Sequence, residues 1–106
     1  MNEIEKAVLD QFKECVCQAF PDSRIILFGS RAKGIAELHS DMDVAVILAD
    51  QPEDSARDYV SECAWAAGYK HGIVVVPVVF GKDEWETGPE RLSLLAKAID
   101  RDGVAI

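Results

Sequence analysis

The chain has 106 residues, of which 49% are hydrophobic, and its formal net charge is −8. The apolar fraction argues against intrinsic disorder, and the length predicts a single domain over residues 1–106. The acidic balance argues against DNA or RNA as a bulk partner, because phosphate backbones are bound by a surplus of Lys and Arg. No stretch approaches the ~18 consecutive apolar residues of a membrane helix, and the N-terminus lacks a signal-peptide layout. The sequence therefore predicts a cytoplasmic protein without membrane association.

The first segment predicts a helix over residues 2–20. Apolar side chains recur there at the three-to-four spacing of one buried helical face. The members of this stripe are Ile4, Val8, Phe12, Cys15, Val16 and Ala19. Pro21 ends the helix, and the apolar run at 24–28 predicts the first strand. We expect Glu3 and Glu5 to be part of a solvated acidic surface.

A glycine-serine turn follows this strand and can hold phosphate. Gly29 allows a phosphate to approach the backbone, and the free N–H groups of a short helix beginning near Arg31 would serve as donors. The Ser30 hydroxyl and the positive charges of Arg31 and Lys33 would add to such a site. An ordinary strand-to-helix turn, with Ser30 as the N-cap, is the alternative that these residues alone leave open.

A pair of aspartates opens the second predicted strand, at about 43–48. Residues two apart in a strand point to the same face, so Asp41 and Asp43 would project side by side. Two carboxylates at this spacing can share one Mg²⁺, which takes few protein ligands and fills its coordination sphere with water and phosphate. Ser30 precedes Asp41 by eleven positions. The sequence therefore predicts that the loop and the aspartates face one site for a metal-bound nucleoside triphosphate.

The rest of the chain predicts a helix from about residue 50 to Ala67, a third strand at 73–80, a short helical segment at 82–86 and a final helix at 89–101. The third strand is apolar at nearly every position, as in a strand covered on both faces, and Pro77 predicts an edge strand or a bulge. Two apolar stripes face the core. They are Ala56, Tyr59, Val60, Cys63, Ala64 and Ala67 in the third helix and Leu92, Leu95, Ala96 and Ile99 in the last. The expected fold class is α/β (α+β), with a small mixed β-sheet packed against helices.

The motif Gly29-Ser-Arg-Ala-Lys-Gly34 with Ser40-Asp-Met-Asp-Val44 resembles that of the DNA polymerase β-like nucleotidyltransferase superfamily, and in particular its minimal nucleotidyltransferase domains. The resemblance implies a nucleotidyltransferase palm in which Gly29 and Ser30 contact the triphosphate. It implies that Asp41 and Asp43 bind Mg²⁺ while an acceptor hydroxyl attacks the α-phosphorus and expels pyrophosphate. Members of this kind pair with a helical HEPN protein and act as its antitoxin, so the resemblance implies a HEPN-type partner.

One feature departs from that family. Active members carry a third carboxylate on a later strand, but residues 72–80 contain no acid, and Val76 or a near neighbour stands at the expected place. Asp83 and Glu84 follow the strand in a predicted helical turn. Two functions therefore remain open. One is AMP transfer from ATP to a hydroxyl of the partner, and the other is a weakly active or inactive nucleotide-binding module that neutralises the partner by contact.

The remaining expectations concern isolated residues. Three cysteines without a C-x-x-C pair predict reduced thiols and no zinc site. We expect Trp65 to pack against the sheet and Trp85 either to anchor the core or to serve a partner surface. His39 is a nucleotide contact or a solvated loop residue. The sequence is also compatible with a homo-oligomer that buries Trp85 or the edge strand.

Overall fold

The protein is described by a computed structural model that covers residues 1–35, 37 and 40–106. Its centre is a four-stranded sheet in the order β3-β2-β1-β4. The strands are β1 (Arg24–Phe28), β2 (Met42–Leu48), β3 (Val75–Gly81) and β4 (Val104–Ala105). β1 is antiparallel to both β2 and β4, whereas β2 and β3 are parallel. The predicted mixed sheet is confirmed.

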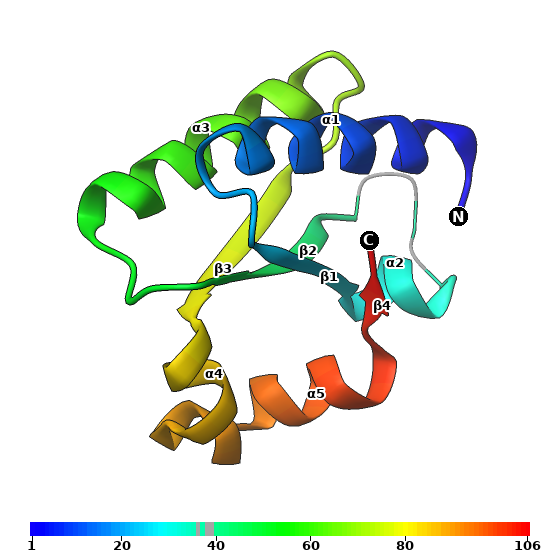
Figure 1. Ribbon diagram of the computed structural model, residues 1–106. Coiled ribbons are helices and arrows are strands. Elements are labelled where there is room, and N and C mark those ends of the chain that lie inside the picture. The colour runs from blue at the N-terminus through cyan, green and yellow to red at the C-terminus, as the bar shows by residue number, and fades with distance from the viewer. Residues whose placement is uncertain (36, 38–39) are drawn as a thin grey trace.

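Two long helices, α1 (Glu3–Ala19) and α3 (Asp54–Tyr69), cover one face of the sheet (Figure 1). α3 connects β2 to β3, as a crossover helix does between parallel strands. The main core lies between these helices and the sheet and includes Val8, Phe12 and Val16, which are fully buried. The predicted stripe of α1 is therefore correct at its centre. It is wrong at its ends, because Ile4 and Ala19, in the first and last turns of α1, are exposed.

The opposite face is covered by α4 (Lys82–Thr87), a 3₁₀ turn (Pro89–Leu92) and α5 (Leu94–Asp102) (Figure 1). A single helix over 89–101 was expected, but the helical structure is interrupted at Ser93. The Ser93 hydroxyl accepts the Ala96 N–H at 3.0 Å and so caps the start of α5. Leu92 falls outside α5 and is exposed, while Ala96 and Ile99 are buried as expected. Trp85 packs beside Phe80, which confirms the core alternative for this residue.

The short strand β4 was not predicted. It pairs with β1 through Ile26 and Ala105, after Gly103 has ended α5. A strand of two residues is too short to produce an alternating pattern, so only the tertiary structure reveals it. β4 and β3 are the two edge strands of the sheet, and an edge position of β3 agrees with the presence of Pro77.

Two expectations about side chains were wrong. Cys15 of α1 and Cys63 of α3 form a disulfide, while Cys17 is a free thiol. Cys15 and Cys63 are 48 positions apart in the sequence, and the sequence alone did not indicate that the fold brings them together. Trp65 does not pack against the sheet. It is 68% exposed and stacks on Tyr69 at a ring-centroid distance of 4.7 Å.

Within the described part of the chain, none of the helices combines the length and the apolar character needed to cross a membrane.

Candidate nucleotide and metal site

The turn between β1 and the short helix α2 (Gly29–Lys33) depends on glycine. Gly29 has a φ of +76°, in the left-handed region that residues with a Cβ adopt only with strain. The strand thus turns into the helix without a spacer, and the N-cap of α2 is Phe28. The alternative in which Ser30 caps the helix is not what the structure shows. Gly34, at a φ of +73°, ends α2.

The loop and the second aspartate lie directly against each other. Phe28 and Asp43 are register partners across the antiparallel β1–β2 pair, so Asp43 enters its strand beside the Gly29 turn. A Cβ placed on Gly29 would lie only 2.5 Å from Asp43 Oδ2. The absence of a side chain at Gly29 therefore gives the Asp43 carboxylate its place. The predicted convergence of the glycine turn with this aspartate is a feature of the fold.

The environment of Asp43 disfavours its charged form. Burial raises the pKa of Asp43, and the negative charge of Asp41 raises it further. Asp41 is exposed and Asp43 is half-buried, so the pair lies at the surface end of β2. Two repelling carboxylates at the rim of a sheet are a donor set that a hard divalent cation would stabilise. The residues present thus fit a metal ion of this class.

The third carboxylate of the family pattern is missing from the neighbouring strand. Val76 is the register partner of Asp43 across the parallel β2–β3 pair. Asp83 and Glu84 belong to α4, beyond the opposite end of β3, and the Glu84 carboxylate accepts the Gly81 N–H at 3.3 Å. Among residues 1–35, 37 and 40–106, no group of three or more His, Cys, Asp or Glu side chains could hold a metal ion. The site described by the structure is therefore built on two carboxylates.

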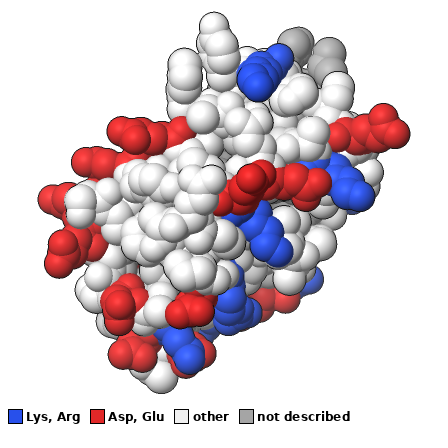
Figure 2. Space-filling model, turned by 45° about the horizontal axis from the view of Figure 1, so that its top comes forward, with Lys and Arg blue, Asp and Glu red and all other residues white. Residues whose placement is uncertain are grey.

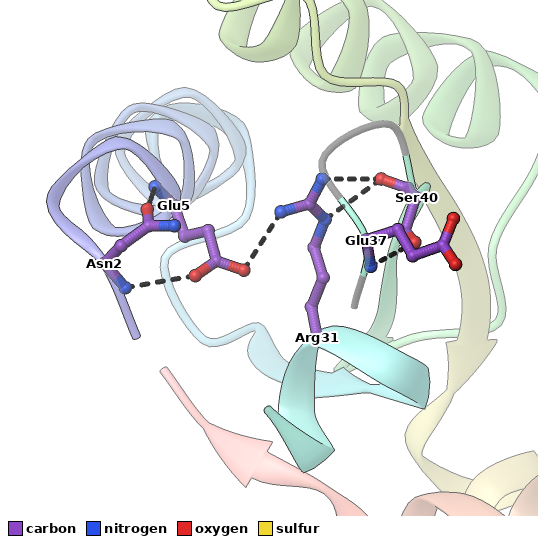
Figure 3. Close-up of polar contacts among 5 residues, drawn as sticks. All are labelled: Asn2, Glu5, Arg31, Glu37 and Ser40. Carbon is purple, nitrogen blue, oxygen red and sulfur yellow. Dashed lines mark hydrogen bonds and ion pairs between the residues drawn. The ribbon is translucent and has the colours of Figure 1, made fainter. Parts of the chain in front are cut away.

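Arg31 and Lys33, both predicted nucleotide contacts, have protein partners. The Arg31 guanidinium donates to the Ser40 carbonyl and to the Glu5 carboxylate (Figure 3). Lys33 Nζ lies 3.5 Å from Asp102 Oδ2 at the end of α5. Their contact with a nucleotide stays a prediction, as it does for Gly29 and Ser30.

Glu5 lies in a different environment from the one predicted. It was expected in solvent, but it is only 8% exposed. Its carboxylate accepts the Asn2 N–H at 3.0 Å, while the Asn2 side chain accepts the Glu5 N–H at 2.7 Å. This reciprocal capping box is visible in the sequence as Asn2-x-x-Glu5, so the pattern could have indicated where Glu5 lies. His39 lies outside the described residues.

Comparison with known proteins identifies the family of the chain. A sequence profile of the nucleotidyltransferase domain matches residues 9–99. The chain belongs to the nucleotidyltransferase domain family. Both the glycine-serine turn and the aspartate pair lie inside the matched range.

Two curated relatives of this chain are provisionally named protein adenylyltransferases. One, from Methanocaldococcus jannaschii, is 27% identical over 77 residues, which are 71% of this chain and 78% of the relative. The other, named MntA and from Haemophilus influenzae, is 37% identical over 60 residues, which are 57% of this chain and 53% of the relative. The chain thus spans only about half the length of the second relative.

A solved structure supports the assignment of the fold. A crystal structure described as a toxin–antitoxin with AMP-PNP superposes with a TM-score of 0.64 at 22% identity. The match covers 95% of this chain and 70% of the other. The predicted nucleotidyltransferase palm is therefore confirmed.

Proposed function

We propose that this protein is a nucleotidyltransferase that moves AMP from ATP to a hydroxyl group of a partner protein. The observation that carries the proposal is the Asp43 carboxylate packed against the Gly29 turn, with the Asp41 charge beside it. This arrangement combines a phosphate-binding turn with a cation-binding pair. The names of the two relatives as protein adenylyltransferases support a protein as the acceptor.

Each residue of the site has a role in this proposal. Asp41 and Asp43 would hold Mg²⁺, while Gly29 and Ser30 would bind the triphosphate. The transfer forms a bond between the acceptor oxygen and the α-phosphorus. It breaks the bond between the α-phosphorus and the oxygen that bridges the α- and β-phosphates, and it releases pyrophosphate and the hydroxyl proton. When bound, Mg²⁺ would neutralise charge that develops on the phosphates.

The partner in this proposal is a HEPN-type toxin, and the protein is its antitoxin. The support is that a solved structure with the same fold is described as a toxin–antitoxin with a nucleotide analogue. A cytoplasmic location and homo-oligomerisation remain predictions beside it. We also predict that the protein does not bind bulk nucleic acid, because its net charge is −8.

The proposal is tested with the protein purified together with the partner that it retains from its own cells. Incubation with Mg²⁺ and α-³²P-labelled ATP should transfer label to the partner. The variants Asp41→Asn and Asp43→Asn should abolish the labelling, because each removes a cation ligand. Asp10→Asn, an exposed change on α1, is the control for loss of one charge. Labelling that persists in both site variants, or that never occurs, contradicts AMP transfer.

A second function is favoured by the position of Val76. With Val76 beside Asp43 in place of an acid, the protein would bind nucleotide with little turnover and neutralise the partner by contact. Under this alternative, Asp41→Asn and Asp43→Asn still protect cells from the toxin. Under the enzymatic proposal, protection is lost while the folded variants still bind the partner.

The variant Val76→Asp tests whether the missing ligand limits turnover. An aspartate at position 76 would lie on the same face of the sheet as Asp43 and supply a third carboxylate. We expect transfer to become faster, with Val76→Asn as the control that adds polarity without charge. A Val76→Asp protein that binds Mg²⁺ and ATP yet transfers no faster would show that Val76 does not limit the reaction.

A further inference from the structure

An ion pair joins the first turn of α1 to α2, and its arginine also bonds to the residue that precedes Asp41. Arg31 Nη1 lies 3.1 Å from Glu5 Oε2, and the two side chains are 5% and 10% exposed. The same guanidinium donates from Nε at 3.0 Å and from Nη2 at 2.6 Å to one atom, the Ser40 carbonyl oxygen. Figure 3 shows Arg31 rising from α2 between Glu5 on one side and Ser40 on the other. Three separate segments of the chain thus meet at one side chain.

The Glu5 carboxylate fixes the orientation of Arg31. Its other oxygen, Oε1, accepts the Asn2 N–H, so the carboxylate is held from both ends. Burial alone would raise the pKa of Glu5, but the Asn2 N–H and the Arg31 guanidinium outweigh this effect and hold it below its usual value. Glu5 is therefore ionised at neutral pH. Replacing either partner of such a buried pair destabilises the folded state, because the charge of the other partner is left uncompensated.

The bonds to the Ser40 carbonyl restrain the backbone position of Asp41. A carbonyl group and the following N–H and Cα lie in one peptide plane, so fixing the Ser40 oxygen also fixes where Asp41 begins. Further along, Met42 N–H donates to the Val74 carbonyl at 2.8 Å and joins the sheet. On the other side, the Ser40 hydroxyl accepts the Glu37 N–H at 3.0 Å. Asp41 is exposed, so the restraint on its backbone comes from these flanking contacts.

We propose that the Glu5–Arg31 ion pair is a positioning device that holds Asp41 in place to bind a divalent cation with Asp43. The proposal rests on the proposed metal-dependent function. Arg31 acts here through the Ser40 backbone, and Glu5 acts through Arg31. Residues that orient metal ligands without touching the metal typically change metal affinity by about 10- to 100-fold when replaced.

The test measures Mn²⁺ affinity by the loss of the free-ion paramagnetic resonance signal, together with thermal unfolding by circular dichroism. Arg31→Lys keeps the positive charge but cannot donate from two nitrogens to Ser40 and from a third to Glu5. Glu5→Gln removes the charge that orients Arg31. We expect both variants, measured below their unfolding transitions, to raise the Mn²⁺ dissociation constant by about tenfold or more.

Two controls separate positioning from stability and charge. Asn2→Ala removes the side-chain cap of α1 and lowers the melting temperature, but it leaves the bonds from Arg31 in place. Glu3→Gln removes one exposed negative charge from the same turn as Glu5. Both should keep the wild-type dissociation constant.

The outcomes are distinguishable. If wild-type protein binds Mn²⁺ no better than Asp43→Asn, no metal site exists, and the proposed function fails together with the inference. If wild type binds Mn²⁺ and Asp43→Asn does not, while Arg31→Lys and Glu5→Gln bind like wild type, only the inference is overturned. It is also overturned if Asn2→Ala weakens binding as much as Glu5→Gln does, because general destabilisation would then explain the loss.

Discussion

Gly29 is the residue on which the candidate site depends most directly. Its φ of +76° and its contact with Asp43 are separate requirements for the absence of a side chain. The first concerns only the backbone, and the second concerns the carboxylate that would bind a cation. Gly34 has a similar φ of +73°, but a Cβ added there would have no neighbour within 4 Å, so Gly34 shares the first requirement alone.

This difference gives a paired prediction. Gly29→Ala and Gly34→Ala should each lower the free energy of unfolding by about 1–2 kcal/mol, the usual strain of a left-handed residue with a Cβ. Only Gly29→Ala should also weaken divalent-cation binding, because the new methyl group must displace the Asp43 carboxylate. Urea denaturation and a metal titration measure the two effects. Equal metal affinity in both variants would contradict the role assigned to the Gly29–Asp43 contact.

Asp43 should be a residue at which function opposes stability. Its pKa is raised in the folded state by burial and by Asp41, so ionising it costs more in the folded than in the unfolded chain. The stability associated with its protonated form is complete below the ordinary Asp pKa of about 3.9 and is lost as pH rises through the folded-state value.

Metal-free Asp43→Asn protein should therefore be more stable than wild type at pH 7. The advantage should shrink as the pH falls and vanish below about 3.9, where the wild-type carboxyl is protonated in both states. Denaturation in EDTA across this pH range measures it, with exposed Asp10→Asn as the charge control. With a saturating divalent cation the order should reverse, since only wild type gains from binding. A variant less stable than wild type at pH 7 without metal would disprove this account.

At the scale of elements, α1 and α3 are joined covalently as well as by packing. The Cys15–Cys63 disulfide closes a loop between residues 48 positions apart, and the Tyr59 hydroxyl of α3 also donates to the Cys15 carbonyl. The predicted helix faces placed both cysteines toward the core but did not say that they meet. Helix faces follow from periodicity, whereas the pairing of two helices depends on how both cross the sheet.

The disulfide predicts a redox-dependent stability. A cross-link over a loop of this length typically stabilises a domain by about 2–4 kcal/mol relative to the reduced form. Urea denaturation with and without a reductant should show this difference, and Cys17→Ser should leave it unchanged. Under denaturing conditions without reductant, iodoacetamide should label one thiol per chain, which is Cys17. Labelling of all three cysteines would show that the bond does not form.

The break between the 3₁₀ turn and α5 shows the limit of periodicity within an element. Leu92, Leu95, Ala96 and Ile99 have a helical spacing, yet Ser93 interrupts the helix by capping a new one. The Arg91 guanidinium lies 4.2 Å from the Trp85 ring centroid and also donates to the Trp85 carbonyl. These contacts hold the 3₁₀ turn over α4, and no local pattern indicated them.

At the scale of the whole molecule, the sheet separates two cores and brings the site residues to one end. The α1–α3 core lies on one face, and a smaller core around Trp85 and Ile99 lies on the other. Asp43 shares the second face with Ala45 and Ile47, at the end of β2 next to the Gly29 turn. The face seen in Figure 2 carries many acidic side chains with basic ones between them, as expected from the net charge of −8.

The sequence predicted the long helices, the three longer strands and the local patterns of the candidate site. The glycine-serine turn, the aspartates two apart, the buried faces at the centres of the long helices and the acid-free third strand are local patterns, because strand and helix periodicities fix which side chains share a face. The tertiary structure alone decided which faces meet. The burial of Glu5 with Arg31, the Cys15–Cys63 bond, the exposure of Trp65 and the pairing of β4 all join segments distant in sequence, and such contacts depend on the packing of the whole sheet.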